Sequence, residues 1–212
     1  MKLIVYLIIM GLLLCNPCFS NNRNKICNGD LIFQESISTD LGKAIKSVTS
    51  SIDNYNFTHV GIVYINENAD TLVLEATKPK VKLTPLNEYL SDNDSIKSVV
   101  FRLKEEYRHL IPLALVEGLK HVGKDYDNTF ILNNDKYYCS EIIYEIFLKS
   151  NNNAPLFELN TMTFKRNNSD NYLEEWIEYF NFFNSPIPEG ELGINPGAMS
   201  KSKVIDKIYD LY

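Results

Sequence analysis

Asp135-Lys136-Tyr137-Tyr138-Cys139-Ser140-Glu141-Ile142-Ile143 is the stretch of sequence that decides how this chain is interpreted. The isoleucines three, four and seven positions after Cys139 predict a helix over residues 139–147, with Cys139 at its start. A thiol at a helix N-terminus lies at the positive end of the helix dipole, which favours the thiolate that attacks carbonyl groups. The same spacing puts Cys139 on the buried stripe, where most cysteines are inert. The stretch by itself leaves both roles open.

The first twenty residues are typical of a secretory signal peptide. Lys2 supplies a short positive start, an apolar run follows over residues 3–14, and small side chains lie near residue 20. The run is too short to cross a bilayer, so we expect an exported, periplasmic or secreted protein without a transmembrane span in its mature chain. A lipoprotein carrying lipid on Cys15 or Cys18 is the less favoured alternative. We expect residues 21–212 to form a single domain, with a core at about 29–150 and a C-terminal extension at about 151–212.

The charge of the chain argues against a nucleic-acid partner, and its cysteine content allows a disulfide. The formal net charge is −6, and removal of residues 1–20 takes away Lys2 alone among the charged residues. A nucleic-acid ligand requires a basic face, so none is expected. Cys27 and Cys139 remain after signal removal, and a disulfide between them in an oxidising compartment is the main structural alternative to a reactive Cys139.

The remaining patterns predict an α+β arrangement in which one group of antiparallel strands packs on helices. Residues 78–94 and the turn-rich segment after Pro186 are expected to be loops that set substrate choice, and residues 204–212 a weak helix or a packed tail. The predicted elements are a strand at 31–33, a helix at 41–48, strands at 59–65, 71–77 and 98–103, a helix at 110–122 capped by Gly123, the helix at 139–147, and an aromatic helix at 170–183.

The strands at 59–65 and 71–77 predict a hairpin that brings a histidine and a carboxylate together. With the loop centred on Glu67, His59 lies opposite Glu75 on the less apolar face of the hairpin. Gly61 on the same face leaves space beside the imidazole. A carboxylate that orients an imidazole is what a thiol nucleophile needs, although the same pair could serve only to stabilise the sheet. A register slip of one residue would separate the two side chains.

The other candidate chemistries are weaker. His109 is expected to be solvated, and His121 suits the end of a helix without any further role. No histidine pair at ligand spacing and no Cys-x-x-Cys occurs in the mature chain, so neither a zinc site nor any other metal or cofactor is expected. The absence of Gly-x-Ser-x-Gly argues against a serine hydrolase.

Four segments together resemble the permuted NlpC/P60 enzymes, which are papain-like cysteine amidases of the YiiX/YaeF type. The segments are Gly29-Asp30-Leu31-Ile32-Phe33-Gln34, Thr58-His59-Val60-Gly61-Ile62-Val63, Val73-Leu74-Glu75-Ala76 and Tyr137-Tyr138-Cys139-Ser140-Glu141. The strands precede the cysteine helix, which is the order of the permuted group. The resemblance implies a circularly permuted papain-like fold: a small antiparallel sheet or partial barrel packed on helices, with the cysteine at a helix N-terminus.

The resemblance also implies roles for individual residues. Cys139 corresponds to the nucleophile, His59 to the general base and acid, and Glu75 to the residue that orients the histidine. Gln34 and Tyr138 occupy motif positions that could line the substrate site. The backbone N–H of Cys139 would be one donor to an oxyanion.

Three functions follow from these patterns. The first is an exported cysteine hydrolase that cleaves an amide bond in a cell-wall peptide or a small amide or acyl-amino conjugate, through a thioester on Cys139. The second is an acyltransferase or lipid hydrolase that uses the same thiol, so the substrate is a small molecule, a peptide or a lipid amide. The third is a non-catalytic exported binding protein on the same fold. The sequence leaves the oligomeric state open.

Overall fold

An open antiparallel sheet organises the part of the chain that the computed structural model describes, namely residues 25–35, 40–91, 97–166 and 169–211. The predicted signal peptide at 1–20 lies outside these residues. Among the described residues six strands form the main sheet in the order β4-β3-β2-β1-β5-β8, and all neighbours are antiparallel. They are β1 (Leu31–Glu35), β2 (His59–Ile65), β3 (Thr71–Thr77), β4 (Lys80–Pro85), β5 (Lys97–Leu103) and β8 (Ile205–Leu211).

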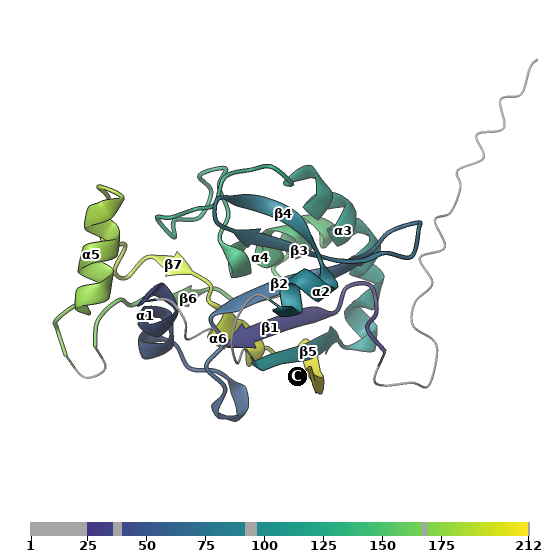
Figure 1. The fold of residues 1–212 in the computed structure, drawn as a ribbon, viewed down its shortest axis with the longest axis horizontal. Helices are drawn as coiled ribbons and strands as arrows, with labels where there is room; N and C mark the ends of the chain where they lie inside the picture. Colours follow the sequence, from purple (N-terminus) through teal and green to yellow (C-terminus); the bar gives the residue numbers. More distant parts are fainter. Residues whose placement is uncertain (1–24, 36–39, 92–96, 167–168, 212) are drawn as a thin grey trace, which may run out of the picture.

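Helices cover both faces of this sheet (Figure 1). On one face α3 (Ile111–Lys120) packs against α4 (Cys139–Ser150), and α4 in turn contacts β2 and β3. The short α2 (Leu86–Ser91) lies on the opposite face. The remaining elements, outside the main sheet, are α1 (Asp40–Val48), α5 (Glu174–Phe182), α6 (Pro196–Ser200), the 3-10 turns η1 (Ile52–Asn54) and η2 (Glu105–Leu110), and the small pair β6 (Asn160–Thr161) and β7 (Leu192–Gly193).

The alternation of side chains along β2 and β3 divides the core in two, as the sequence predicts. Val60, Ile62, Leu74 and Ala76 face α4 and join the larger cluster, together with the buried stripe of that helix. Val63 and Val73 point the other way and pack around the ring of Tyr89 from α2, in a second, smaller cluster. The residues of the candidate site lie at the end of this hairpin, next to the start of α4.

The register of the β2–β3 hairpin differs from the prediction by two residues. Val63 pairs with Val73 and Ile65 with Thr71, so the loop centres on Asn68 rather than on Glu67. A shift of two residues keeps every side chain on its predicted face, because side chains alternate with a period of two. Glu75 therefore still shares a face with His59, but diagonally instead of directly opposite.

Gly61 does not leave the space beside His59 that the sequence suggests. A Cβ atom at this position would come within 2.4 Å of Val73 Cγ1 and 3.2 Å of the Leu74 carbonyl oxygen. The missing side chain thus permits close packing of β3 and of the Tyr89 ring against β2.

Several predictions outside the hairpin are wrong. Residues 80–91, expected as loop, form β4 and α2, and residues 205–211, expected as a helix or tail, form β8 at the sheet edge beside β5. The apolar residues near the C-terminus fit a helical spacing, but pairing with β5 overrides that local preference. Gly123 has the positive φ of +93° expected of a helix cap, yet α3 ends at Lys120 and the Gly123 N–H donates to the Val81 carbonyl.

The Gly29-Asp30 motif has a structural role in front of β1. The Asp30 side chain is fully buried and accepts hydrogen bonds from Arg102 Nε at 2.6 Å and Arg102 Nη2 at 2.8 Å. The backbone N–H of Cys27 donates to the same carboxylate at 2.7 Å. Partners on both sides of a buried carboxylate fix the entry of the chain into the sheet.

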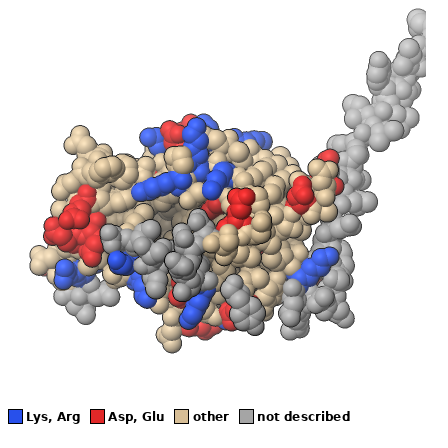
Figure 2. Space-filling model, in the orientation of Figure 1, with Lys and Arg blue, Asp and Glu red and all other residues tan. Residues whose placement is uncertain are grey.

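None of the helices in the described residues is long and apolar enough to cross a membrane. On the face shown in Figure 2, basic and acidic side chains both occur, and acidic ones gather over α5, whose first turn contains Glu174 and Glu175.

Candidate active site

Cys139 is the first residue of α4, and its thiol lies close to the start of β2. Its side chain is buried, and Sγ is 4.0 Å from the carbonyl oxygen of Thr58. Tyr138 before it has an extended backbone, and the Tyr138 N–H donates to Glu141 Oε2 at 3.2 Å. The first N–H groups of a helix have no acceptor within the helix, so the N–H of Cys139 can serve a developing oxyanion.

Glu141 stands two residues from the thiol, and its charge state affects the nucleophile. Burial raises the pKa of Glu141 to about 9, against a weaker opposing effect of the hydrogen bond from the Tyr138 N–H. The carboxyl group is therefore uncharged at neutral pH. An uncharged cap at the helix start does not oppose a thiolate there, as a carboxylate would.

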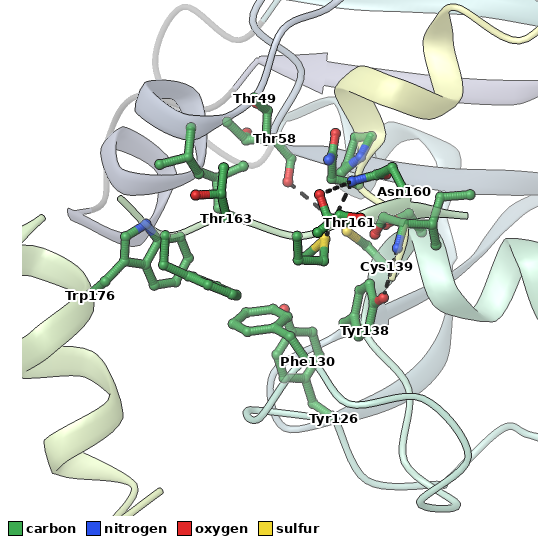
Figure 3. A pocket seen from close by; sticks show the side chains of 18 residues that line it. Thr49, Thr58, Tyr126, Phe130, Tyr138, Cys139, Asn160, Thr161, Thr163 and Trp176 are labelled. Carbon is green, nitrogen blue, oxygen red and sulfur yellow. Dashed lines mark hydrogen bonds between the residues drawn. The ribbon is translucent and has the colours of Figure 1, made fainter. Parts of the chain in front are cut away.

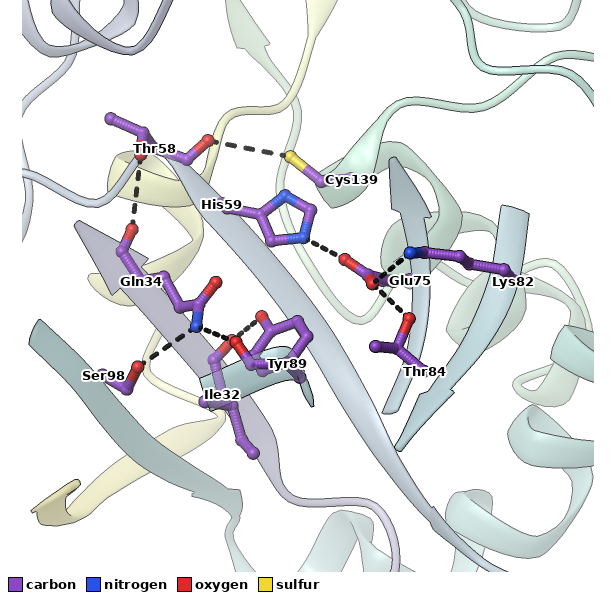
Figure 4. A network of polar contacts seen from close by, with 10 residues as sticks. All are labelled: Ile32, Gln34, Thr58, His59, Glu75, Lys82, Thr84, Tyr89, Ser98 and Cys139. Atoms are coloured by element: carbon purple, nitrogen blue, oxygen red, sulfur yellow. Dashed lines mark hydrogen bonds and ion pairs between the residues drawn. The ribbon is translucent and has the colours of Figure 1, made fainter. Parts of the chain in front are cut away.

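The strands β2 and β3 separate beside Cys139, and His59 and Glu75 meet across the opening. Pairing of β2 with β3 ends at Ile62 and Leu74, whereas β2 stays paired to β1 as far as His59. Beyond that point β3 pairs only with β4. His59 Nε2 lies 2.6 Å from Glu75 Oε2, which closes the opening with one hydrogen bond (Figure 4).

Glu75 is held in place by β4. Its side chain is buried, the Thr84 hydroxyl donates to Oε1, and Lys82 Nζ is 3.8 Å from the same oxygen. Burial alone would raise the pKa of Glu75, but the bond to His59 and the further contacts to Thr84 and Lys82 outweigh it and lower the pKa. Glu75 is thus a fixed carboxylate at neutral pH.

His59 connects the carboxylate to the thiol. Burial disfavours the protonated ring, but hydrogen bonds with Cys139 and with Glu75 outweigh this and raise the pKa of His59 to about 10. Because Nε2 is bonded to Glu75, the other ring nitrogen, Nδ1, is the one turned to Cys139 (Figure 4). An imidazole in this position can take the thiol proton and later return it to a leaving group.

The thiol remains available for this chemistry. Cys139 is a free cysteine, so the predicted alternative, a disulfide between Cys27 and Cys139, is not found.

A pocket opens beside Cys139 and extends toward α1 and α5 (Figure 3). The space between its walls amounts to about 560 Å³ when the open solvent at the mouth is counted. Aromatic rings of Phe130, Phe164 and Trp176 form its apolar wall, and Tyr138 and Ile194 border it near the thiol. The Tyr138 hydroxyl accepts a hydrogen bond from the Ile194 N–H at 3.1 Å, and Ser140 Oγ donates to the Ile194 carbonyl at 2.8 Å. These two bonds tie the loop before α6 to the start of the cysteine helix.

Residues 25–209 match the family of permuted papain-like amidases of the YaeF/YiiX type, family C92. This chain belongs to that family. The uncharacterized protein YiiX of Escherichia coli strain K12 is 32% identical over 146 residues, which cover 66% of this chain and 65% of YiiX. The match thus spans just under two thirds of that relative's length.

The fold of this YaeF/YiiX-family protein also has a solved counterpart. The crystal structure of the metalloprotein YiiX from Escherichia coli O157:H7 superposes with a TM-score of 0.68 at 24% identity, covering 87% of this chain and 97% of that one. The superposition over most of both chains establishes a shared fold.

The five residues that the family resemblance singled out do not all lie together. Cys139, His59 and Glu75 form one connected set, and Tyr138 lines the pocket. Gln34 is paired with His59 across β1 and β2, but its amide nitrogen donates to the Tyr89 carbonyl at 2.9 Å and to Ser98 Oγ at 3.2 Å. Those contacts connect β1 with α2 and β5, and Gln34 does not border the pocket.

The sequence interpretation missed the residues that support this set. Thr84 and Lys82 fell in a segment expected to be a loop, and only the alternation of residues 80–85 could have indicated a strand. The aromatic residues of the predicted helix at 170–183 are expected to be core, and Trp176 among them is also part of the pocket wall. No local signal in residues 160–164 or 194–196 marks them as neighbours of Cys139.

Proposed function

We propose that this protein is a cysteine amidase in which Cys139, His59 and Glu75 act together. The observation that carries the proposal is the position of the His59 ring, whose Nε2 is 2.6 Å from the Glu75 carboxylate and whose Nδ1 is turned to the Cys139 thiol (Figure 4). The His59 pKa of about 10 keeps the ring an imidazolium at neutral pH, and an imidazolium is the partner that activates a cysteine nucleophile. Membership of the amidase family supports the same reaction class.

The acylation half of the reaction follows from the positions of these groups. Cys139 Sγ attacks the carbonyl carbon of the substrate amide, and the oxyanion that forms is stabilised by the N–H of Cys139. The proton on His59 Nδ1 passes to the amide nitrogen, the carbon–nitrogen bond breaks, and a free amine leaves. An acyl group remains bound to Sγ as a thioester.

Deacylation reverses the roles of the same atoms. His59 Nδ1 takes a proton from water, the hydroxide attacks the thioester carbonyl, and Sγ leaves as thiolate. Glu75 keeps its charge throughout and stabilises the imidazolium. If an alcohol or amine enters in place of water, the same steps give acyl transfer, which is the second function that the sequence allows.

The proposal includes no metal ion. The YiiX structure from Escherichia coli O157:H7 is described as that of a metalloprotein. In the part of the present chain that the structure describes, no three His, Cys, Asp or Glu side chains form a group that could hold a metal ion. The direct bond of 2.6 Å between His59 Nε2 and Glu75 Oε2 leaves no space for an ion between these two ligand types. These residues therefore do not fit a metal centre.

The decisive experiment is alkylation of Cys139 by iodoacetamide, followed by peptide mass spectrometry. At about pH 6, where an ordinary thiol is almost fully protonated, we expect Cys139 to react at least ~10 times faster than a small thiol. His59→Ala should remove most of this advantage, because the thiolate loses its imidazolium partner.

His109→Ala provides the matched control. His109 is exposed and its ring contacts only the Glu106 carbonyl among the interactions seen for it, so its loss should leave the labelling rate unchanged. Slow labelling of folded wild-type protein, or equal rates in the wild type and His59→Ala, would reject the cysteine amidase and favour a non-catalytic binding protein.

We also propose that the enzyme acts outside the cytoplasm. The support is the signal-peptide pattern of residues 1–20. Expression in a bacterial host, fractionation and N-terminal sequencing should find a mature protein that begins near Asn21 in the periplasm or medium. Recovery of full-length protein in the cytoplasmic fraction alone would contradict this.

A further inference from the structure

The pocket beside Cys139 lies on one particular side of the thiol. Thr58, Cys139 and Ser140 border it, whereas His59 and Glu75 do not. In the proposed reaction His59 protonates the departing amine, so the amine must lie on the histidine side of Sγ. The part of the substrate that stays on Sγ as the thioester then extends to the other side, into the pocket.

Apart from the Cys139 thiol, the described wall of this pocket has no residue that ionises near neutral pH. None of its described lining residues is Asp, Glu, Lys, Arg or His, and aromatic side chains cover much of it, with Phe130 and Trp176 both almost fully buried. A charged group placed there would lose its hydration without gaining an ionic partner. An uncharged, largely apolar group is what such a wall accommodates.

The pocket nevertheless contains polar atoms without partners. Across the described residues, the buried side-chain nitrogen and oxygen atoms that have no hydrogen-bond partner are Thr49 Oγ1, Asn160 Oδ1 and Trp176 Nε1. All three residues line this one pocket, and Trp176 is only 2% exposed. Buried polar atoms are normally satisfied, so three such atoms around one cavity offer hydrogen bonds to a group that enters it.

The three atoms determine which hydrogen-bonding groups a ligand in the pocket has to supply. Trp176 Nε1 only donates, the free Asn160 oxygen only accepts, and the Thr49 hydroxyl does both. Figure 3 shows Trp176 at the end of the pocket away from Cys139, with Asn160 nearer the thiol. An acyl chain with a hydroxyl or amide group along its length could supply acceptors and donors at these positions while it fills the apolar remainder.

We propose that this pocket is the acyl subsite, and that the substrate carries an uncharged, mainly apolar acyl group bearing hydroxyl or amide functions. The inference rests on the proposed function, since it assigns the acyl half of the same reaction. The proposal disfavours substrates whose acyl part is an acidic segment of a cell-wall peptide. The chemical class is a hydroxyacyl or acylamino-acyl conjugate of an amine.

The test measures acylation of Cys139 by activated esters, read as the mass increase of the intact protein. The esters all carry the same para-nitrophenyl leaving group and differ only in the acyl part. The acyl parts are hexanoic acid, adipic acid as the half ester, and the hydroxyhexanoic acid isomers. We expect the hexanoyl ester to acylate at least ~10 times faster than the adipoyl ester, because the terminal carboxylate would be buried unpaired. At least one hydroxyhexanoyl isomer should react faster still.

Two substitutions remove the unpartnered polar atoms: Thr49→Val keeps the shape of the side chain, whereas Trp176→Phe also removes part of the ring. Trp176→Phe deletes the indole N–H, and Thr49→Val deletes the hydroxyl. At least one of them should abolish the advantage of the favoured hydroxyl isomer over hexanoyl, measured as the ratio of the two acylation rates within the same variant. Phe182→Ala is the control, because Phe182 is on α5 but 82% exposed and outside the pocket.

The outcomes separate this inference from the proposed function. Slow iodoacetamide labelling of Cys139 rejects the cysteine amidase itself. If labelling is fast, any one of three results rejects the acyl subsite and leaves the nucleophile intact. These are no acylation by any ester, equal rates for the hexanoyl and adipoyl esters, and a hydroxyl preference that survives both substitutions.

Discussion

The two sides of Cys139 differ in both chemistry and origin. On one side lie His59, Glu75, Lys82 and Thr84, which we call the polar flank, and they come from the three adjacent strands β2, β3 and β4. On the other side lies the acyl pocket, whose wall is assembled from residues between Ile45 and Pro196. The polar flank is made of fixed ionic and hydrogen-bonded groups, and the pocket of aromatic rings with a few unpartnered polar atoms.

The polar flank therefore controls the chemical step, and the pocket controls which acyl group is accepted. The polar flank sets the protonation of His59 and Cys139, so changes there should affect all substrates alike. The pocket contacts only the acyl group, so changes there should alter the choice of substrate or the stability of the fold and leave the thiol reactive. The following variants test that separation, in order of decreasing expected effect.

Cys139→Ser should reduce amide or ester hydrolysis by about 10⁴-fold or more for every acyl group. The serine hydroxyl keeps the hydrogen-bonding position but is not ionised by His59 as a thiol is. Initial rates with the ester series provide the measurement, and circular dichroism confirms the fold. Residual activity within tenfold of the wild type would remove Cys139 from the reaction.

Phe130→Ala should destabilise the protein by about 3 kcal/mol and leave the thiol chemistry in place. The Phe130 ring is 6% exposed and lies 5.4 to 6.5 Å, between ring centroids, from Tyr138, Phe164, Trp176, Tyr179 and Phe180, so its loss creates a cavity. Denaturant unfolding measures the stability. Below the unfolding transition, iodoacetamide labelling of Cys139 should stay within about threefold of wild type, and a collapse of labelling would show that the two sides are coupled.

Glu75→Gln should lower kcat/KM by about 10²-fold and move the alkaline limb of the pH profile to lower pH. Hydrogen bonds with Cys139 and Glu75 together raise the pKa of His59 to about 10, so the neutral amide lowers that pKa and the imidazolium loses its proton sooner as pH rises. The pH dependence of acylation measures the shift. An alkaline limb that does not move would mean that Glu75 has no effect on His59.

Thr84→Val should have the smallest effect, a loss of about 3- to 10-fold in kcat/KM. Valine keeps the shape but removes the hydroxyl that donates to Glu75 Oε1, while Lys82 remains near the same oxygen. Thr84→Ser, which retains the donor, should restore most of the rate. Equal losses in both variants would point to packing and not to the hydrogen bond.

The same comparison explains how far the sequence predicts the structure. His59 and Glu75 are separated by a short hairpin, and the period of two keeps them on one face even though the predicted register is off by two residues. The bounds of β2 and β3 are confirmed, as are the helix that begins at Cys139 and the antiparallel sheet packed on helices. Local patterns suffice for His59 and Glu75 because the two are near in the chain, but they missed Lys82 and Thr84, whose strand β4 was expected to be a loop.

The acyl pocket could not be predicted in this way. Its wall joins α1, the residues before α4, β6 with the residues after it, α5 and the loop before α6, and these meet only through tertiary packing. An aromatic stripe around Trp176 has the same appearance in a sequence whether its rings fill a core or border a cavity. Likewise β8 contradicts its local helical spacing, because its partner β5 lies about 100 residues earlier in the chain.

That late strand has a consequence for synthesis on the ribosome. When a nascent chain has emerged as far as α5, it already contains Cys139, His59 and Glu75, but β5 still has one unpaired edge. Open edges of apolar strands template pairing with other chains, and β5 includes the buried residues Val99, Val100 and Phe101. Translation that stops before residue 205 should therefore release an aggregation-prone product, and residues 205–211 protect the finished protein from that fate.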